Sequence, residues 1–157
     1  KNNSVSKSVN FSLKKAGISA FISDMSDAIE QMRYILDDKE KLELKNSNRK
    51  DRERLFRSFW KNRDPTPHGF HNELMEEYYR RVHYSNEHFT GFQPGWESDM
   101  GMIYILFGVP DDVERINVHR ERKIYEVWHY LEINNNFTFV DENGFGDFRL
   151  QTPFLGY

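Results

Sequence analysis

Residues 95–112 decide how this sequence is organised, and they read Gly-Trp-Glu-Ser-Asp-Met-Gly-Met-Ile-Tyr-Ile-Leu-Phe-Gly-Val-Pro-Asp-Asp. Before this stretch, apolar residues recur at the three- and four-residue spacing of an amphipathic helix. After it, they alternate or form short aromatic runs separated by Gly, Pro and Asn, a pattern typical of strands and turns. We therefore expect an α+β domain in which about three N-terminal helices pack on a small, largely antiparallel β-meander.

Three segments before residue 91 have the periodicity of helices, and they cover about residues 24–36, 49–63 and 72–89. Residues 39–44 would add a further turn or two. Ser23 is the expected N-cap of the first helix, because a short hydroxyl side chain can accept a hydrogen bond from the first turn. The second helix is expected to end at Asp64, because the residue before a proline is pushed out of the helical conformation.

The β half is expected to begin inside the opening stretch. Residues 102–107 are apolar throughout and predict a central strand that is covered on both faces. Residues 108–112 predict a turn, in which Asp111-Asp112 would cap a short helical turn over residues 113–116. Further strands are expected over residues 123–131, 137–140 and 147–150, the last two joined by a hairpin turn at residues 141–144.

The first 20 residues are rich in Ser and Asn and lie outside this pattern. Val9, Phe11 and Leu13 alternate with polar residues, as in a strand. Because one short strand is not stable alone, we interpret residues 1–20 as a linker or an edge strand from a preceding region. Residues 21–157 then form the domain, with a helical half over residues 21–90 and a β half over residues 91–157.

Composition limits the class of protein. Of the 157 residues, 38% are hydrophobic, 30% are charged and 15% are aromatic, so aromatic rings are expected to fill much of the core. The sequence contains no cysteine, which excludes disulfides and thiolate chemistry. No apolar run approaches the roughly 18 residues that a membrane-spanning helix needs.

Charge is distributed unevenly along the chain. Residues 37–63 contain 10 Lys and Arg against 6 Asp and Glu, a balance of +4, whereas residues 91–157 contain 5 against 11, a balance of −6. A basic helical segment can bind nucleic acid, but acidic residues interrupt this one throughout. We therefore interpret it as a solvated helix and expect no nucleic-acid partner.

No residue pattern in the sequence predicts a catalytic centre or a metal site. The usual glycine-rich phosphate loops and the GxSxG nucleophile motif are missing, so we predict no catalytic residue and no cofactor. His68, His71 and Glu73 are of metal-ligating types, but they span a Pro/Gly turn rather than one helix face, and we predict no metal there.

Aromatic residues form the most prominent set of candidate binding groups. They would line either a groove for glycans or peptides or the core between helices and sheet, and the core is favoured because rings dominate cores as well as sites. For Trp96 partial exposure is the alternative to burial, because this residue follows Pro94-Gly95 in a loop. The set is Phe59, Trp60, Trp96, Trp128, Phe137 and Phe139.

The segment Gly95-Trp96-Glu97-Ser98-Asp99 resembles the signature of the GWxTD domain family, with Ser98 in place of the usual Thr. This substitution keeps the hydroxyl that a capping role needs and loses a methyl group. Other similar segments, which together span about residues 24–152, are Phe59-Trp60-Lys61-Asn62-Arg63-Asp64-Pro65, Asn72-Glu73, Tyr78, Arg81, Gly108-Val109-Pro110-Asp111, Trp128-x-Tyr130 and Phe137-x-Phe139. The residues expected to carry the structural motif are Trp60, Arg63, Asp64, Asn72, Glu73, Gly95, Trp96, Ser98, Asp99, Gly108, Pro110 and Trp128.

The resemblance implies a compartment but no chemistry. Members of the family tend to be larger, exported or envelope-associated bacterial proteins without an established activity. We therefore expect a non-catalytic structural or protein-interaction module of the bacterial cell envelope, periplasmic or outer-membrane associated. Its partners would be other domains of a larger parent chain or envelope proteins. The alternative is a hydrolase or carbohydrate-binding domain with a cleft near Trp96 and Asp99.

Two tertiary contacts are expected to join the halves. Trp60 and Trp96 are expected to be largely buried near the junction. Arg63, at the negative end of the second helix, would hold Asp99 with two hydrogen bonds, while Ser98 or Asp99 caps the turn that precedes residues 102–107. The alternative is that Asp99 is a catalytic acid whose charge Arg63 tunes.

Overall fold

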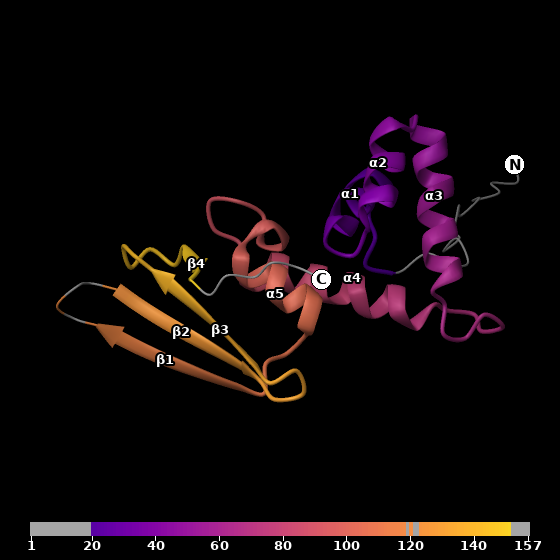
Figure 1. Ribbon diagram of the computed structural model, residues 1–157. Helices are drawn as coiled ribbons and strands as arrows, with labels where there is room; N and C mark the ends of the chain where they lie inside the picture. Colours follow the sequence, from indigo (N-terminus) through magenta and orange to yellow (C-terminus); the bar gives the residue numbers. More distant parts are fainter. Residues whose placement is uncertain (1–19, 119, 121–122, 152–157) are drawn as a thin grey trace, which may run out of the picture.

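The computed structural model describes residues 20–118, 120 and 123–151, and Figure 1 shows a helical half followed by a β half. The helical elements are α1 (Met25–Gln31), η1 (Met32–Tyr34), α2 (Asp38–Asn46), α3 (Arg49–Asn62), α4 (Glu73–His88), η2 (Gly95–Glu97) and α5 (Asp99–Phe107). The strands are β1 (Asp112–Val118), β2 (Lys123–Tyr130), β3 (Asn135–Asp141) and β4 (Phe148–Leu150). The predicted α+β class is confirmed, although the described chain has five α-helices rather than about three. The strand predicted near residues 9–13 lies outside the described residues.

Side-chain caps set where the helices begin. Asp24, rather than the predicted Ser23, caps α1 by accepting hydrogen bonds from the backbone N–H groups of Ser26 and Asp27. A reciprocal pair of hydrogen bonds between Asp37 and Glu40 starts α2. Asn48 and Asn72 cap α3 and α4 in the same way. The helix predicted over residues 24–36 is therefore shorter, and it continues only as the 3-10 turn η1.

Residues 102–107 form most of helix α5, so the predicted central strand is wrong. Ser98 caps this helix by accepting from the N–H of Gly101, and Gly108, with φ of 82°, ends it. The residues between are buried or half-buried on every side. An apolar run without periodicity fits a buried helix as well as a buried strand, so hydrophobic pattern alone does not separate them.

The helical turn predicted after Asp111-Asp112 is also wrong, because residues 112–118 form strand β1. Val113, Ile116 and Val118 are β-branched, which favours a strand. The Asp111 carboxylate accepts a hydrogen bond from the N–H of Leu131 at 2.7 Å. It therefore closes the end of the β1–β2 pair instead of capping a helix.

The four strands form one antiparallel sheet in the order β1-β2-β3-β4, which confirms the predicted meander. Alternate residues of β2 and β3, among them Trp128 and Phe139, point toward α5 and form a core with it. In Figure 1 the helices lie on one side of the sheet, and β1 is its outermost strand.

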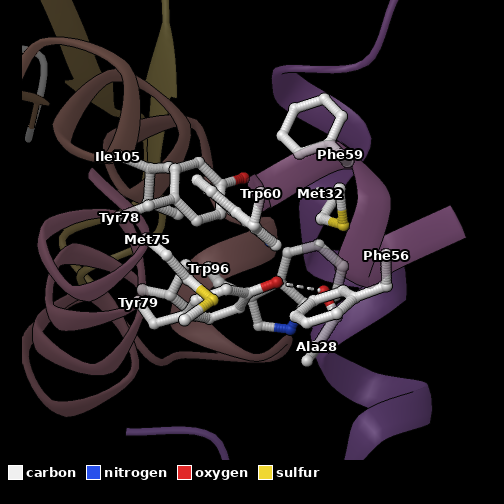
Figure 2. Close-up of a cluster of buried hydrophobic side chains, with 11 residues drawn as sticks. Ala28, Met32, Phe56, Phe59, Trp60, Met75, Tyr78, Tyr79, Trp96 and Ile105 are labelled. Carbon is white, nitrogen blue, oxygen red and sulfur yellow. Dashed lines mark hydrogen bonds between the residues drawn. The ribbon is translucent and has the colours of Figure 1, made fainter. Parts of the chain in front are cut away.

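The buried side chains form two aromatic clusters. The first lies among α1, α3 and α4, and Figure 2 shows the Tyr79 hydroxyl donating to the carbonyl of Ala28 at its centre. The second lies between α5 and the sheet. Trp96 and Ile105 belong to the first cluster, and Met100 and Ile103 belong to the second. The stretch 95–107 therefore contributes side chains to both cores.

Candidate functional site

Residues 95–99 form the joint between the two halves. Trp96 and Trp60 are 8% and 3% exposed, which confirms their predicted burial, and both belong to the helical core. The backbone of Trp96 is tied on two sides: its N–H donates to Oδ1 of Asn86 at 3.0 Å, and its carbonyl accepts from the Tyr34 hydroxyl at 2.8 Å. This residue is therefore fixed to α4 and η1 through its main chain as well as its ring.

The two glycines of the joint permit close approaches of backbone to backbone. A Cβ placed on Gly95 would lie 1.8 Å from the carbonyl oxygen of Ser85 in α4, and one on Gly101 would lie 1.9 Å from the carbonyl oxygen of Gly95. No side chain fits either gap, so only glycine lets η2 lie against α4 and α5 against η2.

The polar residues of the joint hold α5 and the sheet. The Ser98 hydroxyl donates to the Gly95 carbonyl at 2.7 Å and accepts from the N–H of Gly101 at 2.9 Å. Of the two predicted capping residues, Ser98 and Asp99, it is therefore Ser98 that caps, and it caps a helix instead of a turn before a strand. The Asp99 carboxylate accepts from the N–H of Leu150 at 2.8 Å. Asp99 therefore ties the start of α5 to strand β4, 51 residues further along the chain.

The predicted bridge between Arg63 and Asp99 is wrong. The Arg63 guanidinium donates to Glu40 at 2.8 Å and lies 3.7 Å above the Phe59 ring centroid. Because Arg63 follows the last turn of α3, its side chain reaches α2 instead of the β half. Arg63 thus links α3 to α2, whereas Asp99 contacts the sheet through Leu150 without Arg63.

The remaining motif residues stabilise chain turns. Buried Asn72 accepts from the N–H of Met75 and donates to the carbonyl of Trp60, which joins α3 to α4. The Asp64 carboxylate accepts a hydrogen bond from the N–H of Thr66, and the Glu73 carboxylate accepts one from the Thr66 hydroxyl. In the β half, the Gly108 carbonyl accepts from the Tyr130 hydroxyl, and the Trp128 indole N–H donates to Glu126. Pro110 lies in the connection between α5 and β1.

Sequence reasoning missed two residues that support the joint. Asn86 holds the N–H of Trp96 through its side-chain oxygen, and the sequence signal for such a role is an amide on the apolar side of a helix. The Arg81 guanidinium pairs with Glu77 at 2.7 Å. In addition its guanidinium donates to the carbonyls of Ile105 and Leu106, at the end of α5.

Two hollows lie beside the joint. One, of 680 Å³, is lined by Trp96 and Phe92 together with the carboxylates of Asp27, Glu30 and Glu97. The other, of 310 Å³, lies between residues 88–93 and the turn that joins β3 to β4. Asp99 lines neither of them.

The histidines of the predicted turn are not gathered into a metal site: within residues 20–118, 120 and 123–151, no group of three or more His, Asp or Glu side chains is placed to hold an ion. None of the described helices is both long enough and apolar enough to cross a bilayer. In the basic α2–α3 segment, exposed ion pairs such as Arg49–Glu53 and Arg54–Asp51 mix the charges locally.

The β3–β4 turn is built around a buried carboxylate. Asp141 is 2% exposed and accepts hydrogen bonds from the backbone N–H groups of Asn143, Gly144, Phe145 and Gly146. Burial works to raise the pKa of this carboxyl group, but the backbone donors outweigh burial and hold the pKa below its usual range. The charged form is therefore the one that stabilises the turn.

Asp141→Asn is expected to lower the free energy of unfolding at pH 7 by about 1.5–3 kcal/mol, because an amide nitrogen cannot accept from an N–H group. Since the folded-state pKa is depressed, the wild-type advantage is present above the unfolded pKa of about 3.9. It is lost as the pH falls through the folded pKa. Urea unfolding at pH 7 and at pH 3 measures the difference. Asp147→Asn, at a carboxylate paired with exposed Arg149, is the control. A gap between wild type and Asp141→Asn that does not depend on pH would contradict this account.

Among the known proteins compared with this chain, only a family model matches it. No match was found among curated proteins or among solved structures. The sequence does match the GWxTD domain over residues 3–150, a range that includes the helices, the joint and all four strands. The chain therefore belongs to the GWxTD domain family.

Proposed function

We propose that this domain is a non-catalytic protein-docking module of the bacterial cell envelope, and that strand β1 receives an extended segment of the partner. Its partners would be other domains of a larger parent chain or other envelope proteins. The observation that carries the proposal is the difference between the two edges of the sheet. β1 presents a seven-residue edge, exposed along nearly its whole length.

The opposite edge is short and blocked. Strand β4 has three residues, and the N–H of Leu150 is already bound by Asp99. An open edge strand offers a row of backbone donors and acceptors to another chain, and natural proteins usually cover or shorten such edges. Because the described residues close one edge of this sheet with a motif residue and leave the other edge open, β1 is the favoured place for strand addition.

The side chains of β1 define the partner that would fit. Ile116 is 42% exposed and lies on the same face as Glu114, while Val113 is 47% exposed and lies on the other face. A partner strand would therefore place an apolar residue beside Ile116 and a basic one beside Glu114. This predicts an extended segment in which every second residue faces this side of the sheet, and in which these residues alternate between apolar and Lys or Arg.

Selection of a displayed library of random peptides against the whole chain tests the proposal. We expect enriched peptides to show this alternation and to slow hydrogen exchange of the backbone amides in residues 112–118. Ile116→Lys should weaken binding by about tenfold or more, because it removes the apolar contact and adds repulsion toward the Lys or Arg of the partner. Leu42→Ser, at an exposed residue of α2, is the matched control and should bind as the wild type. Peptides that leave the exchange of residues 112–118 unchanged would refute docking at β1.

A further inference from the structure

The 310 Å³ hollow is lined by no residue of β1 and is formed by three parts of the chain. They are the end of α4 with the loop after it, the start of α5, and the sheet with its β3–β4 turn. Figure 1 shows this loop and this turn at the same end of the molecule. A hollow of this size is at the lower end of the range for small-ligand sites.

Three phenylalanine rings line the hollow, one each from Phe89, Phe92 and Phe148. Phe92 is 87% exposed, although its loop is well anchored. The Thr90 hydroxyl donates to the carbonyl of Asn86 and accepts from the N–H of Gly95. The loop thus holds the face of an aromatic ring at the rim of the hollow, where a flat apolar surface of a ligand can stack on it.

Three polar side chains lining the hollow are each held by one contact and keep a second acceptor atom available. Glu126 Oε1 accepts from the Trp128 indole N–H at 2.9 Å, Asp147 Oδ2 accepts from the Arg149 guanidinium at 3.0 Å, and Gln93 Nε2 donates to the Glu97 carbonyl at 3.1 Å. Within the described part of the chain, Glu126 Oε2, Asp147 Oδ1 and Gln93 Oε1 have no hydrogen-bond partner. Contacts of this kind orient acceptors before a ligand arrives, which lowers the entropy cost of binding.

The charges around the hollow are balanced. Asp147 is paired with Arg149. Arg115 lies directly across from Glu126 in the sheet register, and its guanidinium is 5.9 Å from the Phe148 ring centroid. Two carboxylates and two guanidinium groups favour neither an anion nor a cation. A ligand that fits is therefore neutral, rich in hydroxyl donors and flat on an apolar face.

A sugar ring has these properties, since its C–H face packs on an aromatic ring while its hydroxyls donate to carboxylate and amide oxygens. We propose that the hollow between Phe92 and the β3–β4 turn binds a neutral oligosaccharide, with Phe92 as the stacking residue. Glu126, Asp147 and Gln93 accept from its hydroxyls. This activity is separate from docking at β1, and neither depends on the other.

The Trp128 indole provides a specific signal, because its N–H is bonded to Glu126. The test titrates the ¹⁵N-labelled chain with maltotriose, cellotriose and chitotriose and follows the indole N–H resonances of Trp60, Trp96 and Trp128. We expect at least one trisaccharide to shift the Trp128 resonance saturably and to leave that of Trp60, buried in the other core, unchanged.

Two substitutions at exposed phenylalanines separate stacking from general effects. Phe92→Ser should raise the Kd by about tenfold or more, whereas Phe70→Ser, at a 93% exposed ring away from the hollow, should leave it unchanged. Both variants keep the fold because neither ring is buried. The proposal is overturned if none of the three trisaccharides shifts Trp128, if Phe92→Ser binds as the wild type, or if a trilysine peptide produces the shift instead. None of these results bears on exchange protection at β1.

Discussion

Replacing Gly95 by alanine is expected to lower the free energy of unfolding by more than about 4 kcal/mol, or to prevent folding altogether. The added Cβ would lie 1.8 Å from the carbonyl oxygen of Ser85 and 2.9 Å from the Cα of Asn86. Both obstacles are backbone atoms of α4, so no side-chain rotation relieves the overlap. The 3-10 turn η2 would have to move off α4, and Trp96 would leave the helical core with it.

Gly91→Ala is the matched control for this experiment. It places the same methyl group in the same loop, where no atom lies within 4 Å, and it should change stability by less than about 0.5 kcal/mol. Urea unfolding followed by circular dichroism measures both variants. If Gly95→Ala were as stable as Gly91→Ala, the close approach of η2 to α4 would not exist in solution.

Trp60→Ala is expected to cost about 3–5 kcal/mol of unfolding free energy, the usual loss on deleting a large buried ring. The Trp60 ring lies within 5.1–6.5 Å of the ring centroids of Phe56, Phe59, Tyr78 and Tyr79. It therefore fills the centre of the helical core, and its removal leaves a cavity that these four side chains cannot close by small shifts.

Trp60→Phe distinguishes the packing of this ring from its polar atom. The indole N–H of Trp60 is buried and has no hydrogen-bond partner in the described structure. Phenylalanine keeps most of the ring and removes the unsatisfied donor, so its cost should be well below that of alanine, about 2 kcal/mol or less. Thermal or urea unfolding of both variants gives the comparison. Equal losses for alanine and phenylalanine would mean that ring packing does not dominate at this position.

The helices before residue 90 and the hairpins after residue 123 were predictable because each has a signal among residues that are close together in the sequence. The apolar side of α4 repeats at helical spacing, Pro65 lies just beyond the end of α3, and the turns at residues 134–135 and 141–144 carry Asn, Asp and Gly. The predicted ranges therefore agree with α3, α4, β2, β3 and β4 to within a few residues. These signals depend on residues a few positions apart, and tertiary packing only had to agree with them.

Residues 102–107 could not be assigned from the sequence, because a run that is apolar on all sides has no period to read. Whether such a run becomes a helix or a strand depends on what surrounds it. Here α4 lies against one side and the sheet against the other, and Ser98 supplies the cap. The prediction was thus wrong at two consecutive elements, α5 and β1, while the predicted class of fold was right.

The roles of the motif residues also divide into those that local sequence sets and those that tertiary packing sets. The sequence by itself determined that Trp60 and Trp96 are buried, that Ser98 or Asp99 has a capping role, and that Asp141 starts a hairpin turn, because size, apolarity and short polar side chains act locally. Only the tertiary structure decided that Arg63 binds Glu40 and that Asp99 binds Leu150. A long flexible side chain such as that of arginine reaches several carboxylates within one fold. Its partner is set by where distant helices and strands come to lie, and no spacing along the chain records that.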